Sequence, residues 1–216
     1  MPISHRPPHQ SPTRSYLAAN HPKHRNHLLG GAEAQLKKQW FDGAAVATLL
    51  AHLPENANLL IGNSLPIRHL DQYGRTQSKT LHIFGNRGAS GIDGNIATGL
   101  GVATATKRPT FIVVGDVTAL HDLNSLLLAR QTPNATLIVI NNNGGGIFRR
   151  LPISQHEPPF TDRFLTPHGR TFAHAAAMFE LDYFCRKSGG ICNCGRNGRI
   201  FPCPPPDRTD HRRSQG

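Results

Sequence analysis

Three residues near the middle of the chain have the types and the spacing of a metal–phosphate site. Asp116 follows an apolar run over residues 111–114, and Asn142 and Gly144 follow a second apolar run over residues 136–140. Mg²⁺ takes hard oxygen ligands and is usually held by one or two carboxylates together with substrate phosphates. A carboxylate, an amide oxygen and a glycine carbonyl would leave positions for phosphate oxygens and water. The residue types therefore predict a Mg²⁺–phosphate site, and a strand-end Asp with a glycine turn that binds nothing is the alternative.

Two buried strands and one crossover helix would position these residues. The runs over residues 111–114 and 136–140 are rich in β-branched side chains, which is typical of strands buried on both faces. Apolar side chains recur at helical spacing between the runs and predict a helix directly after Asp116. Its buried stripe would hold Leu120, Leu123 and Leu127, widened by Ala119 and Leu126. A strand–helix–strand unit brings both polar strand ends to one edge of a parallel sheet, where open α/β sheets bind ligands.

Further apolar patterns predict the rest of an α/β domain. The expected elements are a helix that has Asp42 as its N-cap and stops at Pro54, strands over residues 57–61 and 80–84, a helix over residues 93–106, a loop over residues 152–170 and a helix over residues 171–181. Short apolar runs alternating with helical segments are typical of a doubly wound parallel sheet. We predict this α/β fold for residues 41–184.

The two ends of the chain differ in composition from this middle part. Residues 1–40 hold six Lys/Arg and one Glu, residues 185–216 hold seven Lys/Arg and two Asp, and residues 41–184 hold eleven Lys/Arg and ten Asp/Glu. The net charge of +11 thus belongs almost wholly to the ends and forms no patch on a folded face. We predict no nucleic-acid partner, and a nucleic-acid-binding protein that uses its tails is the competing hypothesis.

Neither end shows an apolar period. We interpret residues 1–40 as a mostly disordered, basic, Pro/His-rich segment, and residues 185–216 as an irregular Cys/Arg/Pro-rich tail of the kind that a shifted reading frame produces. No apolar run approaches the ~20 residues needed to cross a bilayer. The amino terminus lacks the apolar core of a secretion signal. We therefore expect a cytoplasmic protein without a membrane partner.

Five motifs, in order, carry a resemblance to a known enzyme family. They are GNSLPIR (62–68), GNRGASGIDG (85–94), GDVTALHDLNSL (115–126), NNNGGGIF (141–148) and FAHAAAMFEL (172–181). The third and fourth resemble the diphosphate-anchoring motif of thiamine diphosphate (ThDP) enzymes, with Val117 where many have another glycine. Together the five resemble MenD, the 2-succinyl-5-enolpyruvyl-6-hydroxy-3-cyclohexene-1-carboxylate synthase family of menaquinone biosynthesis. The resemblance matches the carboxy-terminal, diphosphate-binding third of that family's chain, and therefore implies the ThDP-binding fold.

The resemblance implies roles for individual residues. It implies ThDP and Mg²⁺ (or Mn²⁺) as cofactors, with Asp116, Asn142 and Gly144 as the metal ligands. Ile92 would be the apolar wedge that holds ThDP in its bent shape. The other implied cofactor-binding residues are Val117, Thr118, Gly145 and Ile147, and the implied substrate-binding residues are Asn63, Ser64, Arg68, Arg87, Phe148 and Leu151. Without the resemblance, Asn63, Ser64 and Arg68 would form an ordinary strand–helix turn in which Ser64 caps the next helix. The apolar residues Ile92, Ile147, Phe148 and Leu151 would belong to the hydrophobic core.

The resemblance also implies an activity. The complete enzyme, a transferase that is a homodimer or homotetramer, would decarboxylate 2-oxoglutarate on ThDP and add the succinyl unit to isochorismate. Both substrates are anionic, so Arg68 and Arg87 can bind their carboxylates. The family's activating glutamate lies on a separate pyrimidine-binding domain, and neither Glu33 nor Glu55 has a matching context.

We therefore interpret the chain as a fragment that is inactive alone. Two alternatives stay open. One is another ThDP-dependent 2-oxo acid decarboxylase or synthase, and the other is a non-catalytic Mg²⁺-binding α/β domain.

Overall fold

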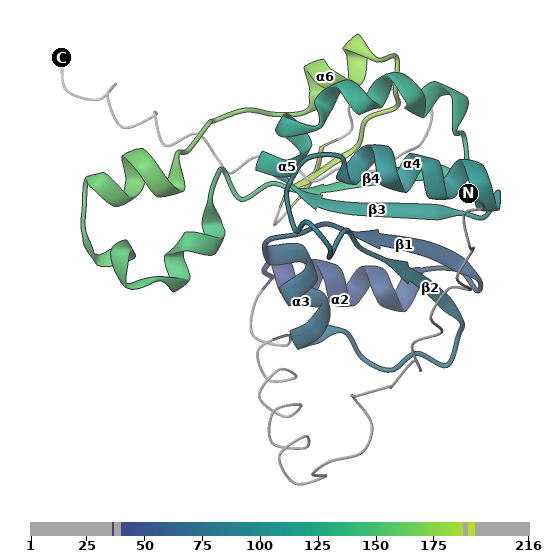
Figure 1. Ribbon diagram of the computed structural model, residues 1–216, viewed down its shortest axis with the longest axis horizontal. Helices are drawn as coiled ribbons and strands as arrows, with labels where there is room; N and C mark the ends of the chain where they lie inside the picture. Colours follow the sequence, from purple (N-terminus) through teal and green to yellow (C-terminus); the bar gives the residue numbers. More distant parts are fainter. Residues whose placement is uncertain (1–35, 37–39, 188–189, 193–216) are drawn as a thin grey trace, which may run out of the picture. The chain divides into compact units, whose positions relative to one another are not determined.

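The computed structural model describes residues 36, 40–187 and 190–192. Within these residues the main sheet has four strands in the order β2–β1–β3–β4, and all of its pairings are parallel (Figure 1). The strands are β1 (Ala57–Ile61), β2 (Leu81–Phe84), β3 (Thr110–Gly115) and β4 (Ala135–Ile140). The predicted parallel α/β sheet is confirmed, and each observed strand begins and ends within about one residue of its prediction, which is the usual uncertainty of such boundaries.

Alternate side chains of the strands enter two separate hydrophobic clusters. One cluster holds Leu60 of β1, Ile112 and Val114 of β3 and Val139 of β4. The other holds Leu59 and Ile61 of β1, Val113 of β3 and Ile140 of β4. Because successive side chains of a strand point to opposite faces, an unbroken apolar run is what a sheet covered on both sides requires.

Helices cover both faces of this sheet (Figure 1). On one face lie α2 (Asp42–His52) and α3 (Leu65–Tyr73), and α2 buries Val46 and Leu50 in the second cluster. On the other face lie α4 (Asn95–Thr106), α5 (Asp116–His121) and α6 (Ala173–Met178), and α4 buries Ile96 and Leu100 in the first cluster. The predicted doubly wound arrangement is therefore confirmed.

The crossover after β3 differs from the single helix that was predicted. α5 ends at His121, and a 3₁₀ helix, η1 (Leu123–Gln131), follows it. In a 3₁₀ helix residues three apart share a face, so Leu126 follows Leu123 into the core while Leu127 turns outward. Leu126 is 5% exposed and Leu127 is 67% exposed, so the prediction of a buried Leu127 was wrong.

Asp122 gives a physical reason for this break. Its Oδ2 accepts hydrogen bonds from the backbone N–H groups of Ile96, at 2.6 Å, and Ala97, at 3.3 Å. The first N–H groups of a helix have no partner within that helix. Asp122, which lies between α5 and η1, thus accepts hydrogen bonds from N–H groups at the start of α4. This is a tertiary contact, and the spacing of apolar residues along one helix cannot predict it.

Other predicted boundaries also need correction. Asp42 is the first residue of α2, with Phe41 at the N-cap position, and the Asp42 side chain makes no cap hydrogen bond. The loop predicted over residues 152–170 contains two short helical turns, η3 (Pro152–Gln155) and η4 (Thr161–Leu165), which follow η2 (Gly146–Arg150). α6 is shorter than the predicted helix over residues 171–181.

The tail predicted to be irregular starts with a small antiparallel pair, β5 (Cys185–Lys187) and β6 (Gly190–Cys192). The rest of that tail, residues 193–216, lies outside the described residues, as does almost all of the amino-terminal segment that was predicted to be disordered. The domain boundaries thus stay a prediction. None of the described helices is long and apolar enough to cross a membrane.

Candidate diphosphate and metal site

A hollow of about 150 Å³ lies at the carboxyl ends of β3 and β4. Every predicted cofactor-binding residue lines it: Ile92, Asp116, Val117, Thr118, Asn142, Gly144, Gly145 and Ile147. Among the predicted substrate-binding residues, Ser64 and Phe148 also line it. Segments far apart in the sequence therefore converge at the edge where open α/β sheets bind ligands.

Asp116, the first residue of α5, is 2% exposed and tightly held. Its Oδ1 accepts a hydrogen bond from the Val117 N–H at 2.9 Å, and its Oδ2 accepts one from the Gly144 N–H at 2.8 Å. The Nε2 atom of His168 lies 3.0 Å from the same Oδ2. Burying a carboxylate is costly unless it has such hydrogen-bond partners. These contacts fix its orientation and connect the end of β3 to the loop after β4.

Asn142 presents an amide oxygen that lacks a partner. Its Nδ2 donates to Asp42 Oδ2 at 2.9 Å, and since a carboxylate can only accept, this bond identifies the nitrogen and the oxygen of the amide. Asn142 Oδ1 is buried and has no hydrogen-bond partner among the described residues. Buried polar atoms normally have a partner. A cation that prefers oxygen ligands fits this pairing of a free amide oxygen with a buried carboxylate.

Gly144 occupies a position that other residues cannot easily take. Its φ of +125° lies outside the range of ordinary side-chain-bearing residues, and a Cβ atom there would collide with the carbonyl oxygen of Leu165. The neighbouring Gly145 N–H donates to that carbonyl at 2.7 Å. The glycine thus permits the close approach of the segment around Leu165 to the asparagine loop.

A metal at this site would depend on neutral oxygens as well as on Asp116. No group of three or more His, Cys, Asp or Glu side chains suited to a metal ion occurs in the part of the chain that the structure describes. Asn142 and Gly144 both line the hollow and offer an amide oxygen and a backbone carbonyl as hard, uncharged donors. Hard oxygen donors favour Mg²⁺ or Mn²⁺ over softer metals.

The other predicted substrate-binding residues do not line the hollow. Asn63 is 2% exposed, and its Nδ2 donates to the carbonyl oxygens of Asn86, at 3.0 Å, and Gly91, at 2.6 Å. Its Oδ1 accepts from the exposed Arg87 guanidinium at 2.6 Å. Asn63 therefore holds the glycine-rich loop in place, a structural contact that its sequence position did not predict.

Arg68 and Leu151 are also outside the hollow. The Arg68 guanidinium is exposed and donates to the carbonyl oxygen of Ser64 at 2.6 Å, within the first turn of α3. Leu151 is 47% exposed. Ser64 itself has a φ of +72°, which is uncommon for a residue other than glycine and often marks a functional turn.

Two histidines near the site were not identified from the sequence. His168 contacts Asp116 from 52 residues away, and no local pattern signals this contact. His69 lines the hollow, is 6% exposed, and has no hydrogen-bond partner on either ring nitrogen among the described residues. Its helical spacing from Leu65, which also lines the hollow, could have indicated it. Burial lowers the pKa of His69 below 6.5, opposed by the nearby Asp42 carboxylate and reinforced by Arg150.

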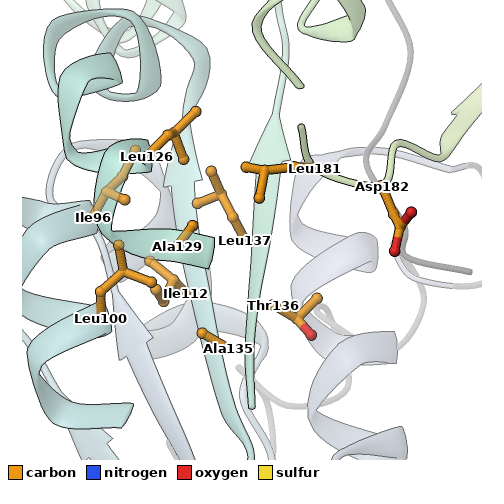
Figure 2. Close-up of a pocket in the computed structure, with 10 residues that line it drawn as sticks. All are labelled: Ile96, Leu100, Ile112, Leu126, Ala129, Ala135, Thr136, Leu137, Leu181 and Asp182. Carbon is orange, nitrogen blue, oxygen red and sulfur yellow. The ribbon is translucent and has the colours of Figure 1, made fainter. Parts of the chain in front are cut away.

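A second space of about 50 Å³ lies inside the first hydrophobic cluster (Figure 2). Its lining consists of Ile96, Leu100, Ile112, Leu126, Ala129, Ala135, Thr136, Leu137, Leu181 and Asp182. Thr136 and Asp182 lie to one side of the apolar group and do not converge with other polar residues (Figure 2). This space is a gap in side-chain packing and not a candidate site.

Comparison with known proteins identifies a family and a related fold. The family described as "Thiamine pyrophosphate enzyme, C-terminal TPP binding domain" matches residues 66–188, TPP being a synonym of ThDP. The fold resembles the thiamine diphosphate-dependent 4-hydroxybenzoylformate decarboxylase of Rhodococcus jostii RHA1, with a TM-score of 0.53 and 19% identity over 67% of this chain and 27% of that one.

Curated relatives are more similar in sequence. The 2-succinyl-5-enolpyruvyl-6-hydroxy-3-cyclohexene-1-carboxylate synthase of Roseiflexus sp. (strain RS-1) is 55% identical over 154 residues, which cover 70% of this chain and 26% of the relative. The synthase of Geobacillus thermodenitrificans is 45% identical over 146 residues, covering 67% and 25%. The chain thus spans about a quarter of the length of these relatives. Since the family match covers more than half of the chain and the fold agrees with it, the chain belongs to the thiamine pyrophosphate enzymes through a C-terminal TPP-binding domain, homologous to that of MenD synthases.

Proposed function

We propose that the hollow binds the diphosphate end of ThDP together with Mg²⁺ (or Mn²⁺). The observation that carries this proposal is that two residues line one hollow: Asp116, whose carboxylate is buried and oriented, and Asn142, whose amide oxygen has no partner among the described residues. These two oxygens and the Gly144 carbonyl would hold the metal. Val117, Thr118 and Gly145 would lie beside the diphosphate.

Apolar residues would bind the rest of the cofactor. Ile92 and Ile147 are half-buried and line the hollow, where they would contact the rings and exclude water. Phe148 is 37% exposed at the same hollow and would extend this apolar wall toward the substrate. ThDP, when bound, supplies the carbanion chemistry, and the protein's part is to bind and orient.

The reaction that we propose for the complete protein is that of the MenD synthases. It would decarboxylate 2-oxoglutarate and add the succinyl unit to isochorismate in menaquinone biosynthesis, as a homo-oligomer. Arg68 and Arg87, whose guanidinium groups are exposed, would bind substrate carboxylates, and Arg87 would exchange its bond to Asn63 for a substrate oxygen. Asn63, Ser64 and Leu151 would shape this side of the site.

The residues that bind the metal and those that activate the cofactor would belong to different domains. By the family resemblance, the activating glutamate lies on a separate pyrimidine-binding domain. Residues 41–184 would therefore bind the diphosphate end of ThDP, and turnover would require that other domain.

Calorimetric titration of the purified chain with ThDP, with and without Mg²⁺, tests the binding. We expect Mg²⁺-dependent binding by the wild type and at least a ~100-fold loss in Asp116→Ala, equivalent to ~2.8 kcal/mol. Asp71→Ala is the matched control, because it removes an exposed carboxylate on α3 and should leave the affinity unchanged. Equal affinity in wild type and Asp116→Ala would disprove the site. Release of CO₂ from 2-oxoglutarate by the purified chain would contradict the division between domains.

A further inference from the structure

The imidazole of His168 is held on both sides. Its Nδ1 accepts a hydrogen bond from the backbone N–H of Arg170 at 2.9 Å. Because Nδ1 must accept this bond, the ring proton lies on Nε2, which therefore donates to Asp116 Oδ2 at 3.0 Å. The His168 side chain is 12% exposed. The backbone of its own loop thus fixes the tautomer that supports the carboxylate.

His168 supports Asp116 from outside the hollow. Asp116 lines the hollow, whereas His168 does not. Asp116 Oδ2 has two partners, Gly144 N–H and His168, while Oδ1 has the Val117 N–H. Since a carboxylate oxygen has two lone pairs, Oδ1 keeps one for a metal ion while His168 stays in place.

The segment that carries His168 is bound to the asparagine loop. The Gly169 N–H donates to Asn143 Oδ1 at 2.7 Å, and Asn141 Nδ2 donates to the Arg170 carbonyl at 3.0 Å. The same loop carries Asn142 and Gly144, which would complete the metal site. One short segment therefore connects the carboxylate to the loop that holds the other candidate ligands.

We propose that His168 is a positioning residue for the metal-binding carboxylate. It donates to Asp116 Oδ2 and so directs Oδ1 toward the hollow. This inference rests on the proposed metal site. Hydrogen-bond partners of metal ligands commonly change metal affinity about 10–100-fold when they are removed.

Direct measurement of metal binding tests this role without an activity assay. The probe is Mn²⁺, followed by electron paramagnetic resonance on the full chain with inorganic pyrophosphate. We expect His168→Ala to weaken Mn²⁺ binding roughly tenfold or more. His168→Gln places an amide N–H donor near the Nε2 position and should recover part of the loss, whereas the shorter His168→Asn should not. His174→Ala, which removes an exposed histidine on α6, is the matched control.

Amide hydrogen exchange at Gly169, whose N–H donates to Asn143 and not to His168, separates this role from general loosening of the segment. We expect its protection to persist in His168→Gln while the Mn²⁺ affinity of that variant stays between those of the wild type and His168→Asn. Equal Mn²⁺ affinity in the wild type and in all the His168 variants, or tighter Mn²⁺ binding by the variants that lack the imidazole, would overturn the inference while leaving the metal site intact. If His168→Ala does not fold, the ordering of Gln and Asn decides. Absence of Mn²⁺ binding in the wild type would instead refute the proposed site.

Discussion

The two sides of the sheet's carboxyl edge differ in how they are built. On the side of β3 and β4, Asp116 is buried and oriented, and Asn142 keeps an unpaired acceptor. On the side of β1 and β2, Asn63 uses both ends of its amide on its own chain, and Arg87 is exposed with one bond to Asn63. The first side is already arranged to accept the metal and phosphate that we propose, whereas the second would have to exchange internal contacts to bind the proposed anionic substrates. Organisation in advance reduces the cost of binding.

Glycine substitutions should show this contrast most strongly. Gly144→Ala introduces a Cβ that collides with a backbone carbonyl, at a φ of +125°, and should reduce the free energy of unfolding by about 3 kcal/mol. Gly88→Ala is the matched change in the glycine-rich loop of the other side, where nothing lies within 4 Å of the added Cβ. It should shift stability by less than ~0.5 kcal/mol. Urea unfolding of both variants measures the difference, and similar losses would mean that the two loops are equally constrained.

The two asparagines should separate stability from metal binding. Asn63→Ala leaves the Asn86 carbonyl without its side-chain donor and removes the shorter of the two side-chain hydrogen bonds to the Gly91 carbonyl. It should cost about 2–3 kcal/mol of unfolding free energy, with Mg²⁺ affinity nearly unchanged. Asn142→Ala loses the bond to Asp42 but also removes a buried unpaired oxygen, so stability should change by less than about 1 kcal/mol. Its Mg²⁺ affinity should fall on the order of tenfold, or about 1.4 kcal/mol.

Urea unfolding and calorimetry on the same preparations test both asparagine variants. The contrast between the two sides would be wrong if Asn63→Ala weakened Mg²⁺ binding more than Asn142→Ala did.

The smallest effect concerns pH and His69, which lies between the two sides on α3. Burial lowers the pKa of His69 in the folded chain below 6.5. Between this lowered pKa and 6.5, the unfolded chain therefore binds more protons than the folded chain does. The contribution of His69 to stability is complete above pH 6.5 and declines as the pH falls toward the folded-state pKa, by at most ~1.4 kcal/mol per pH unit for one proton. His69→Leu removes this titrating group, so the free energy of unfolding should depend less on pH between pH 5 and 7.

Thermal unfolding across that pH range measures the His69 effect. His174→Leu, at an exposed position on α6, serves as the control and should keep the wild-type slope. A His69→Leu profile parallel to that of the wild type would exclude the assignment.

The sheet, and the meeting of Asp116 and Asn142 at one of its edges, could be predicted from the sequence for one physical reason. Unbroken β-branched runs fix where the buried strands end, and the residues that follow them, Asp116 and Asn142, must meet at one edge. The break at Asp122, the support from His168 and the internal bonding of Asn63 could not be predicted, because each depends on a contact between residues distant in sequence. Local periodicity reports which face is apolar and does not report which polar groups satisfy one another.

The strand order has a kinetic consequence. β1 pairs with β3 through residues such as Asn58 and Thr110, and the cluster that buries α2 also contains Ile140 of β4. α2 thus shares a hydrophobic cluster with β4, the last strand of the main sheet. Parallel pairings close long loops, which slows folding. Two of the three hydrogen-bond partners of the Asp116 carboxylate, Gly144 and His168, are in place only when the segments after β4 have folded. During folding, affinity for the proposed metal should therefore appear last, after the sheet has formed, and such a metal ion would stabilise the finished domain without speeding its nucleation.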